Sequence, residues 1–136
     1  MNDVRIIVVK QPWAWLICDG PKDIENRNWK HAPRFRGRVL IAASARRPTR
    51  SEWDTVATFA KKRGVSIPTR EDLMCGGVVG DSTLVDCVRE HSSPWFFGPI
   101  GLVLANRRPL SFVPIAGQLG LYTPSPDVLA KLQSVL

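Results

Sequence analysis

The stretch GGVVGDSTLVDCV (residues 76–88) combines the apolar and β-branched residues of a long strand with three glycines. Glycine within a strand marks a bend, a bulge or a barrel corner, because it contributes no side chain to the packing there. The stretch therefore predicts a long strand with a bend, of the kind found at the corners of a barrel.

Shorter strands are predicted on both sides of this one. Their shared signal is a short apolar run, or an alternation of apolar and polar residues, between turn residues. The expected strands are VRIIVV (4–9), residues 23–29, GRVLIAAS (37–44), GLVLAN (101–106), LSFVPI (110–115) and GQLGLY (117–122), with NRRP (106–109) as a turn.

Helices are predicted between these strands and after them. A short helix covers 12–20, and a longer one covers 51–63, with Ser51 as its cap and Asp54 three residues later. A last helix covers about 125–135. About six strands with two to three decorating helices predict an α+β fold, a small β-barrel. A chain of 136 residues is expected to form one domain.

The cysteines and the apolar runs argue against several classes of protein. Cys18, Cys75 and Cys87 form no CxxC pair and have no histidine at metal-ligand spacing, so we expect buried thiols in a reducing cytosol and neither metal nor cofactor. The longest apolar run is broken by Lys10 and Pro12, and no signal peptide is evident. We expect a cytoplasmic protein without a membrane partner. The oligomeric state stays open.

Positive charge is concentrated in the first half of the chain. Residues 1–68 contain fourteen lysines and arginines against six acids, and in 22–50 nine basic residues face only Asp23 and Glu25. Clustered arginine is typical of proteins that bind phosphate, because its planar fork contacts phosphate with two donors. RNA or a nucleotide-like ligand is the expected partner, and duplex DNA is a further possibility. The alternative is a solvated basic face.

GPKDIENRNW (20–29) is the candidate binding segment. Alternation along a strand places Glu25, Arg27 and Trp29 on one face, with Lys22 at the mouth of the site and Trp13 of the preceding helix beside it. A carboxylate, a guanidinium and indoles can together contact a nucleobase by hydrogen bonds and stacking. The alternative is a structural ion pair between Glu25 and Arg27 with tryptophans in the core.

Two further segments have both a structural and a functional interpretation. SPWFFGP (93–99) is either an aromatic loop that covers an open barrel end or a lid whose Trp95 stacks on a ligand. Arg36, in the turn before the strand at 37–44, either contacts phosphate or is solvated.

Four segments together resemble the ASCH domain family in their order and spacing: QPWAWLICDGPKDIENRNW (11–29), RGRVLIAAS (36–44), GGVVGDSTLVDCV (76–88) and RPLSFVPIAGQLGLY (108–122). The central match is the pattern G-x-K-x-x-E-x-R at Gly20, Lys22, Glu25 and Arg27. The resemblance covers about 5–123 and implies a PUA-like barrel. It also implies a cleft lined by the first helix, the Lys-Glu-Arg segment and the strand that carries Thr83 to Asp86.

The resemblance also implies two activities. One branch of the family is similar to amidohydrolases that remove the acetyl group of N4-acetylcytidine with a Lys, a Thr and a Glu, and other members are linked to cleavage of single-stranded RNA. The lysine falls on Lys22, but Glu25 occupies the threonine position and Ala42 a position where the family often has histidine.

Three hypotheses follow. The first is binding of RNA or a modified nucleobase in a basic cleft. The second is a small hydrolase at the same cleft, with Lys22 and Glu25 as acid and base, and Ser44 and Thr83 as further groups. The third is a regulatory module that binds protein or duplex DNA through the arginines of 34–50.

Overall fold

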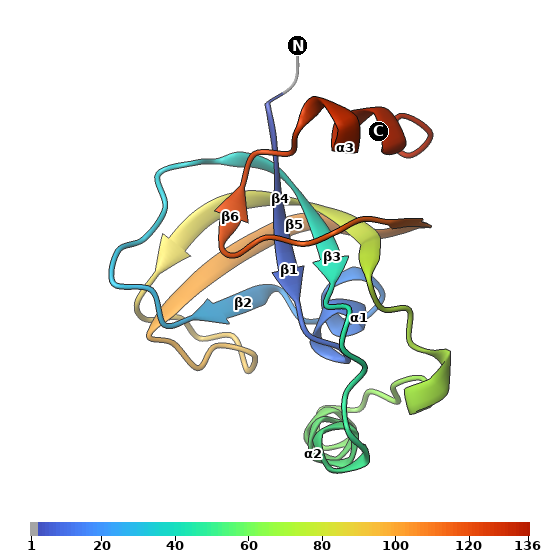
Figure 1. Ribbon diagram of the computed structural model, residues 1–136. Coiled ribbons are helices and arrows are strands. Elements are labelled where there is room, and N and C mark those ends of the chain that lie inside the picture. Colours follow the sequence, from blue (N-terminus) through green and yellow to red (C-terminus); the bar gives the residue numbers. More distant parts are fainter. Residues whose placement is uncertain (1–2) are drawn as a thin grey trace.

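A curled six-stranded sheet, in the order β2-β5-β4-β3-β1-β6, forms the body of the molecule (Figure 1). The computed structural model describes residues 3–136. The strands are β1 (Val4–Val9), β2 (Ile24–Arg27), β3 (Gly37–Ala43), β4 (Gly77–Val88), β5 (Ile100–Pro114) and β6 (Leu121–Tyr122). The helices are α1 (Trp13–Cys18), α2 (Arg50–Lys61), α3 (Pro126–Lys131) and the short 3-10 helix η1 (Arg70–Asp72). The predicted α+β fold with about six strands is confirmed, as a half-closed barrel.

The curl of the sheet originates in the two long strands. Among the strands of residues 3–136, only β1 and β3 are parallel, and the other neighbouring strands pair antiparallel. Three register shifts interrupt the β4–β5 ladder, and such bulges increase local twist and bend. Gly80 lies at the first of them, where any side chain would collide with Cys18 of α1. The bend expected from the glycines of 76–88 is therefore also the place where α1 packs closely on the sheet.

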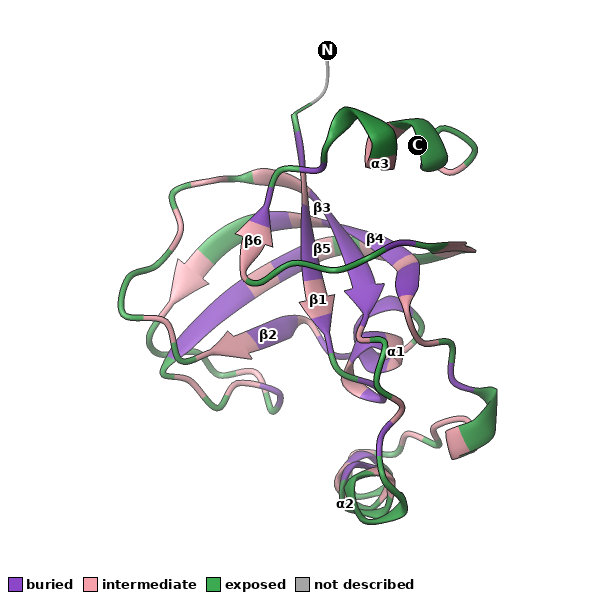
Figure 2. Cartoon of the chain, viewed as in Figure 1, coloured by how far each residue is buried: buried purple, intermediate pink, exposed green. Residues whose placement is uncertain are grey.

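Apolar side chains alternate between the two faces of the sheet, as the two-residue period of a strand requires. From β1, Ile7 and Val9 join the core cluster that contains α1, while Val4 and Ile6 join the cluster on the opposite face. That opposite face is covered by Val128 and Leu129 of α3 and by Leu132, the residue that follows the helix. Figure 2 shows the resulting pattern: the strands are largely buried, and the outer surfaces of α2 and α3 are exposed.

Helix α2 packs on α1 rather than on the sheet. Val56 and Ala60 form a third apolar cluster with Leu16 and Trp95. Thr49 is the N-cap and forms a capping box with Glu52, so the predicted cap at Ser51 is wrong. Both positions are followed by an acid three residues later, but only the longer Glu52 side chain reaches back to the cap backbone.

Two predicted strands, 101–106 and 110–115, are in fact one, the fifteen-residue β5. The turn expected at 106–109 is instead part of the strand, where the β4–β5 pairing is irregular and Asn106 has φ 51°. Pro109 is tolerated because β2 pairs only with residues 100–103 of β5, so the strand has a free edge beyond that point.

Three further elements are shorter than predicted. β2 ends at Arg27 rather than at residue 29, and β6 contains only Leu121 and Tyr122. Helix α3 ends at Lys131 and begins after Ser125, whose side chain accepts from the Val128 N–H as the N-cap. No helix of the described residues is long and apolar enough to cross a membrane.

Candidate functional site

A cavity of about 870 Å³ lies at the seam of the half-barrel, the side where the edge strands β2 and β6 are not paired with each other. Residues of β2 form one wall, and the end of β1 with the loop before β6 forms the other. The lining residues are Val8, Val9, Lys10, Trp13, Lys22, Glu25, Asn26, Arg27, Asn28, Ser44, Ala45, Phe97, Gly98, Gly117, Gln118, Leu119 and Gly120. The volume is within the range of sites that enclose a small organic ligand, about 300–1,000 Å³.

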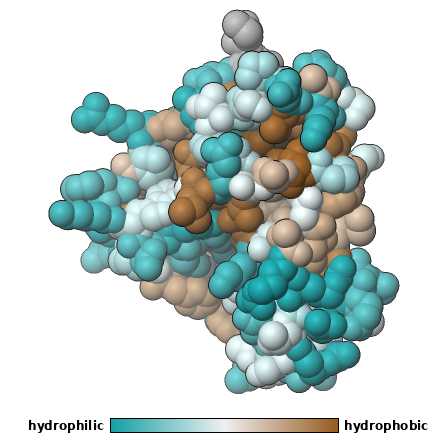
Figure 3. Space-filling model, viewed as in Figure 1, coloured by the Kyte–Doolittle hydropathy of each residue, from teal (hydrophilic) through white to brown (hydrophobic). Residues whose placement is uncertain are grey.

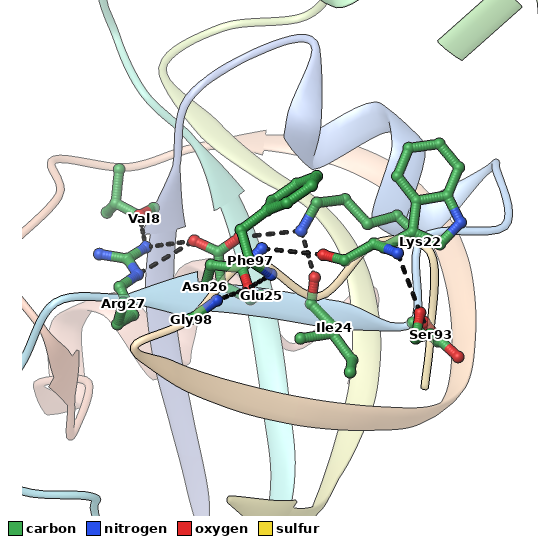
Figure 4. Close-up of polar contacts among 11 residues, drawn as sticks. Val8, Lys22, Ile24, Glu25, Asn26, Arg27, Ser93, Phe97 and Gly98 are labelled. Carbon is green, nitrogen blue, oxygen red and sulfur yellow. Dashed lines mark hydrogen bonds and ion pairs between the residues drawn. The ribbon is translucent and has the colours of Figure 1, made fainter. Parts of the chain in front are cut away.

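Glu25 is held between two cations in the wall formed by β2. Arg27 donates to its Oε2 at 3.0 Å, and the Lys22 Nζ donates to its Oε1 at 3.4 Å. Glu25 is 8% exposed and Lys22 is 2% exposed. Figure 4 shows Lys22 and Arg27 reaching the carboxylate from opposite sides. We name these three residues the Glu25 triad.

The Lys22 ammonium is almost excluded from water. It donates to the Ile24 carbonyl as well as to Glu25, and it lies 5.7 Å from the centroid of the Trp13 ring. Burial lowers the pKa of Lys22 below its ordinary value, against the opposing effect of Glu25. The expectation that Lys22 lies at the mouth is therefore wrong. Lys22 precedes β2, so strand alternation does not constrain its side chain, which turns inward to the carboxylate.

Arg27 connects the two walls of the cavity. Besides bonding Glu25, its guanidinium donates to the Val8 carbonyl of β1 at 2.7 Å. β6 pairs only with Ile6 and Ile7, so the ladder on that side of β1 stops one residue before Val8. Arg27 thus gives a hydrogen bond to β1 where the sheet itself supplies no strand, and it holds the seam at a fixed width.

Asn26 fixes the loop that carries the aromatic residues. Its side chain donates to the Trp95 carbonyl at 2.9 Å and accepts from the backbone N–H groups of Phe97 at 2.7 Å and Gly98 at 3.0 Å. Phe97 lines the cavity and stays 53% exposed. Both residues lie in segments singled out from the sequence, but neither was proposed as a site residue, because they are 71 positions apart and their contact forms only in the fold.

Five of the residues proposed from the sequence line the cavity: Trp13, Lys22, Glu25, Arg27 and Ser44. They come from α1, from the segment that leads into β2, from β2 itself and from the end of β3. Their roles toward a ligand stay predictions.

The other four proposed residues lie elsewhere. Trp95 is 3% exposed and packs against Phe59 of α2, so the loop at 93–99 covers the core with this ring. Trp29 lies beyond the end of β2 and packs on the main core cluster. Arg36 is exposed and donates to backbone carbonyls of its own turn, and Thr83 is a partly buried residue of β4.

The basic segment 22–50 does not form one surface. The seven-residue strand β3 separates Arg36 from Arg46, which places them about 20 Å apart at opposite ends of the strand. Arg38 bonds Asp81, Arg46 bonds Glu52 and Arg50 lies 3.8 Å from Glu71. The excess charge of the sequence is thus partly neutralised by local acids.

A second buried carboxylate offers a comparison with Glu25. Asp81 of β4 is 6% exposed and accepts from Arg38 of β3 at 2.8–3.1 Å and from Arg108 of β5 at 3.1–3.3 Å. We name this group the Asp81 triad. None of its members lines the cavity. Among residues 3–136, no three His, Cys, Asp or Glu side chains gather as a metal site.

Comparisons with known proteins give a consistent picture. The family model described as "ASCH domain" matches residues 7–104. The chain is 37% identical over 83 residues to human activating signal cointegrator 1, and 37% identical over 81 residues to the mouse protein of that name. These matches cover 60% and 59% of this chain but only 14% of each relative.

Solved structures agree with the fold. The ASCH protein of Zymomonas mobilis superposes with a TM-score of 0.60 at 15% identity, over 97% of this chain and 94% of that one. A point mutant of the same protein gives a TM-score of 0.60 at 15% identity, over 98% of both chains. At this identity the likeness concerns the fold alone.

Proposed function

Since the chain belongs to the ASCH domain family, we propose that it binds RNA, with a nucleobase or modified nucleobase held in the seam cavity against the Glu25 triad. The observation that carries this proposal is an almost water-free carboxylate between two cations in the wall of an open cavity. Placing three charged groups there costs desolvation free energy that apolar residues would avoid. The charged groups are explained if they bind a ligand, because apolar residues could not form the same hydrogen bonds.

The triad has the hydrogen-bonding character that a base edge requires. A carboxylate only accepts hydrogen bonds, whereas lysine and arginine only donate them. Glu25 can accept from an exocyclic amino or ring N–H group, and the flanking cations can donate to a ring nitrogen or carbonyl. Lys10, an exposed cation of the cavity lining, adds positive charge for a neighbouring phosphate.

Titration of the wild-type protein with labelled single-stranded RNA, duplex RNA and duplex DNA of one sequence tests this proposal. We expect RNA to bind with an affinity that decreases linearly on a plot of log K against log salt, because phosphate contacts release counterions. An affinity that does not change with salt would contradict the nucleic-acid proposal. Nucleosides, including N4-acetylcytidine, form a second arm that reports the cavity without phosphates.

A hydrolytic activity at the same cavity is the second candidate. It is favoured by the buried Lys22, whose lowered pKa makes a neutral amine more accessible as a base. In hydrolysis of N4-acetylcytidine, Lys22 or Glu25 would take a proton from water as the water oxygen attacks the carbonyl carbon of the acetyl group and the bond from that carbon to N4 breaks. The same group would return the proton to the leaving amine.

Product analysis distinguishes the hydrolase from a binding module. N4-acetylcytidine and labelled single-stranded RNA are incubated with the wild type and with Lys22→Ala. Products that form with the wild type and not with the variant would support the hydrolase. Intact substrates with bound RNA would leave binding as the function.

A further inference from the structure

We infer that Phe97 and Leu119 form a clamp across the seam that holds the base by its two faces, with Asn26 positioning Phe97. This inference rests on the proposed function and specifies its ligand: a nucleotide whose base is unpaired and unstacked from its neighbours. From the sequence, Trp95 is a candidate for the stacking role only as the alternative to a loop that covers the barrel end, and the structure buries that ring in the core.

The two clamp residues are unusual among the apolar side chains of the described chain. Five large apolar residues are exposed: Met74, Val85, Phe97, Leu119 and Leu136. Of these, only Phe97, at 53% exposed, and Leu119, at 99% exposed, line the cavity. Exposed apolar groups in the lining of a cavity that also carries a few polar groups are typical of a ligand-binding site.

Phe97 and Leu119 belong to opposite walls. Phe97 lies in the loop that Asn26 ties to β2, at one edge of the sheet. Leu119 lies in the loop that leads into β6, at the other edge. Figure 3 shows hydrophobic side chains gathered in the middle of the face that carries β1 and β6, surrounded by hydrophilic ones. A flat ring that enters the cavity between the walls therefore meets an apolar side chain on each side.

The Phe97 ring is held in place without being covered. The Asn26 side chain fixes the backbone from Trp95 to Gly98 through three hydrogen bonds, one that it donates and two that it accepts. The Phe59 ring of α2 lies 5.2 Å from the Phe97 ring at 68°, an edge contact. Such preorganisation reduces the entropy lost when a ligand binds.

This geometry selects an unpaired base. Within a duplex both faces of a base are occupied by its neighbours and its edge by the partner base, so neither the clamp nor the Glu25 triad can reach it. Proteins that hold a base outside its stack place it between aromatic or apolar side chains and contact its Watson–Crick edge. The clamp and the Glu25 triad supply these two kinds of contact in one cavity.

The test compares variants in the binding of an RNA hairpin, whose loop nucleotides are unpaired, and of a fully paired RNA duplex with the same stem sequence. Phe97→Ala should weaken binding of the hairpin about 10-fold or more, as removal of a stacking ring does at single-strand sites. Phe97→Tyr should retain wild-type affinity, and Phe97→Leu should remain weak because it is apolar but has no ring. Val85→Ala, exposed and outside the cavity, is the matched control.

Asn26 is tested by partial rescue. Asn26→Ala should weaken binding several-fold although Phe97 is unchanged. Asn26→Asp, which can still accept from the Phe97 and Gly98 N–H groups, should recover part of the loss. Thermal unfolding of each variant verifies that the fold is retained.

Three outcomes would contradict the clamp, and they differ in whether the proposed RNA binding is also contradicted. Wild-type affinity in Phe97→Leu would exclude stacking on the ring. If Glu25→Gln weakens binding and Phe97→Ala does not, the clamp is wrong and the proposed function stands. If the wild type binds neither RNA, both are wrong.

Discussion

Glu25 and Asp81 are both buried carboxylates between two cations, yet they lie in different surroundings. Asp81 joins three adjacent strands, because its partners Arg38 and Arg108 come from the strands on either side of it. Arg108 is directly opposite Asp81 in the ladder, so part of this triad is a cross-strand pair. Glu25 lies on an edge strand, beside a cavity and one buried lysine.

The difference indicates different roles for two chemically similar groups. The Asp81 triad uses two arginines that reach toward solvent, with side chains 23% and 59% exposed, so its cations are partly hydrated. The Glu25 triad includes a lysine that is 2% exposed, which no strand pairing requires. We interpret the Asp81 triad as a device that stabilises the sheet and the Glu25 triad as a device that binds a ligand.

The largest effect is expected for Lys22→Met, which removes the buried charge and keeps a side chain of similar length. RNA affinity should decrease about 10- to 100-fold, because a hydrogen bond to a charged group contributes about 1.5–3 kcal/mol. The free energy of unfolding should decrease by less than the loss of about 3–5 kcal/mol typical of breaking a buried ion pair, because Arg27 still pairs with Glu25 and the desolvated ammonium is removed. Calorimetric binding and urea unfolding measure the two quantities. An unfolded variant would contradict the assignment to ligand binding.

Asp81→Asn should show the opposite pattern. We expect about 2 kcal/mol lower free energy of unfolding, because the hydrogen bonds of Arg38 and Arg108 lose their charged acceptor. RNA affinity should stay within about two-fold of wild type, a difference of about 0.4 kcal/mol that we count as no effect. Urea unfolding with parallel RNA titration tests this. A large loss of affinity in a folded protein would mean that the Asp81 triad also serves binding.

Lys22→Arg replaces the lysine of the Glu25 triad by arginine, the residue that supplies both cations of the Asp81 triad. Burial lowers the pKa of Lys22 below 10.5, so between the lowered pKa and 10.5 the unfolded chain binds more protons at this residue than the folded chain. The contribution of Lys22 to the free energy of unfolding therefore rises with pH in that window, whereas arginine stays protonated.

RNA affinity should follow the charge of Lys22. In the wild type it should decrease as the pH rises through the lowered pKa, and in Lys22→Arg it should be flat over the same window. Titrations at a series of pH values measure this, with exposed Lys62→Arg as the matched control. Parallel profiles for the wild type and Lys22→Arg would contradict a charged Lys22 as a binding group.

The smallest effect is expected for Arg108→Ala. The Arg108 side chain is 59% exposed, and exposed ion pairs contribute about 0–1 kcal/mol to stability. The free energy of unfolding should decrease within that range and RNA affinity should not change. A loss larger than that of Asp81→Asn would show that Arg108 acts beyond its pairing with Asp81.

Much of the fold could be predicted from the sequence because the strands keep a clear period. β1 and β3 were recognisable as apolar runs, and the glycines of 76–88 predicted the bend at Gly80. β5 was not predicted as one strand, because Asn106 and Pro109 are turn residues by local preference. The free edge of β5, which tolerates them, is a property of the whole sheet.

The site was predictable only where its members are close in sequence. Glu25 and Arg27 were placed together by alternation, and the structure joins them in an ion pair. The contact of Asn26 with the loop at 95–98 and the wall formed by Leu119 depend on the curl of the sheet, which brings its two edges to one seam. Local patterns carry no information on that closure.

The most direct test measures Glu25→Gln beside Asp81→Asn, for RNA affinity and for thermal unfolding in the same samples. Each change replaces a carboxylate by its amide, so the two variants differ only in which triad they alter. We predict that Glu25→Gln loses about 10-fold in affinity and that Asp81→Asn keeps its affinity, while the midpoint falls in both folded proteins, because each change leaves two cations without a charged acceptor. Equal loss of affinity in both, or unfolding of Glu25→Gln alone, would contradict the division of roles.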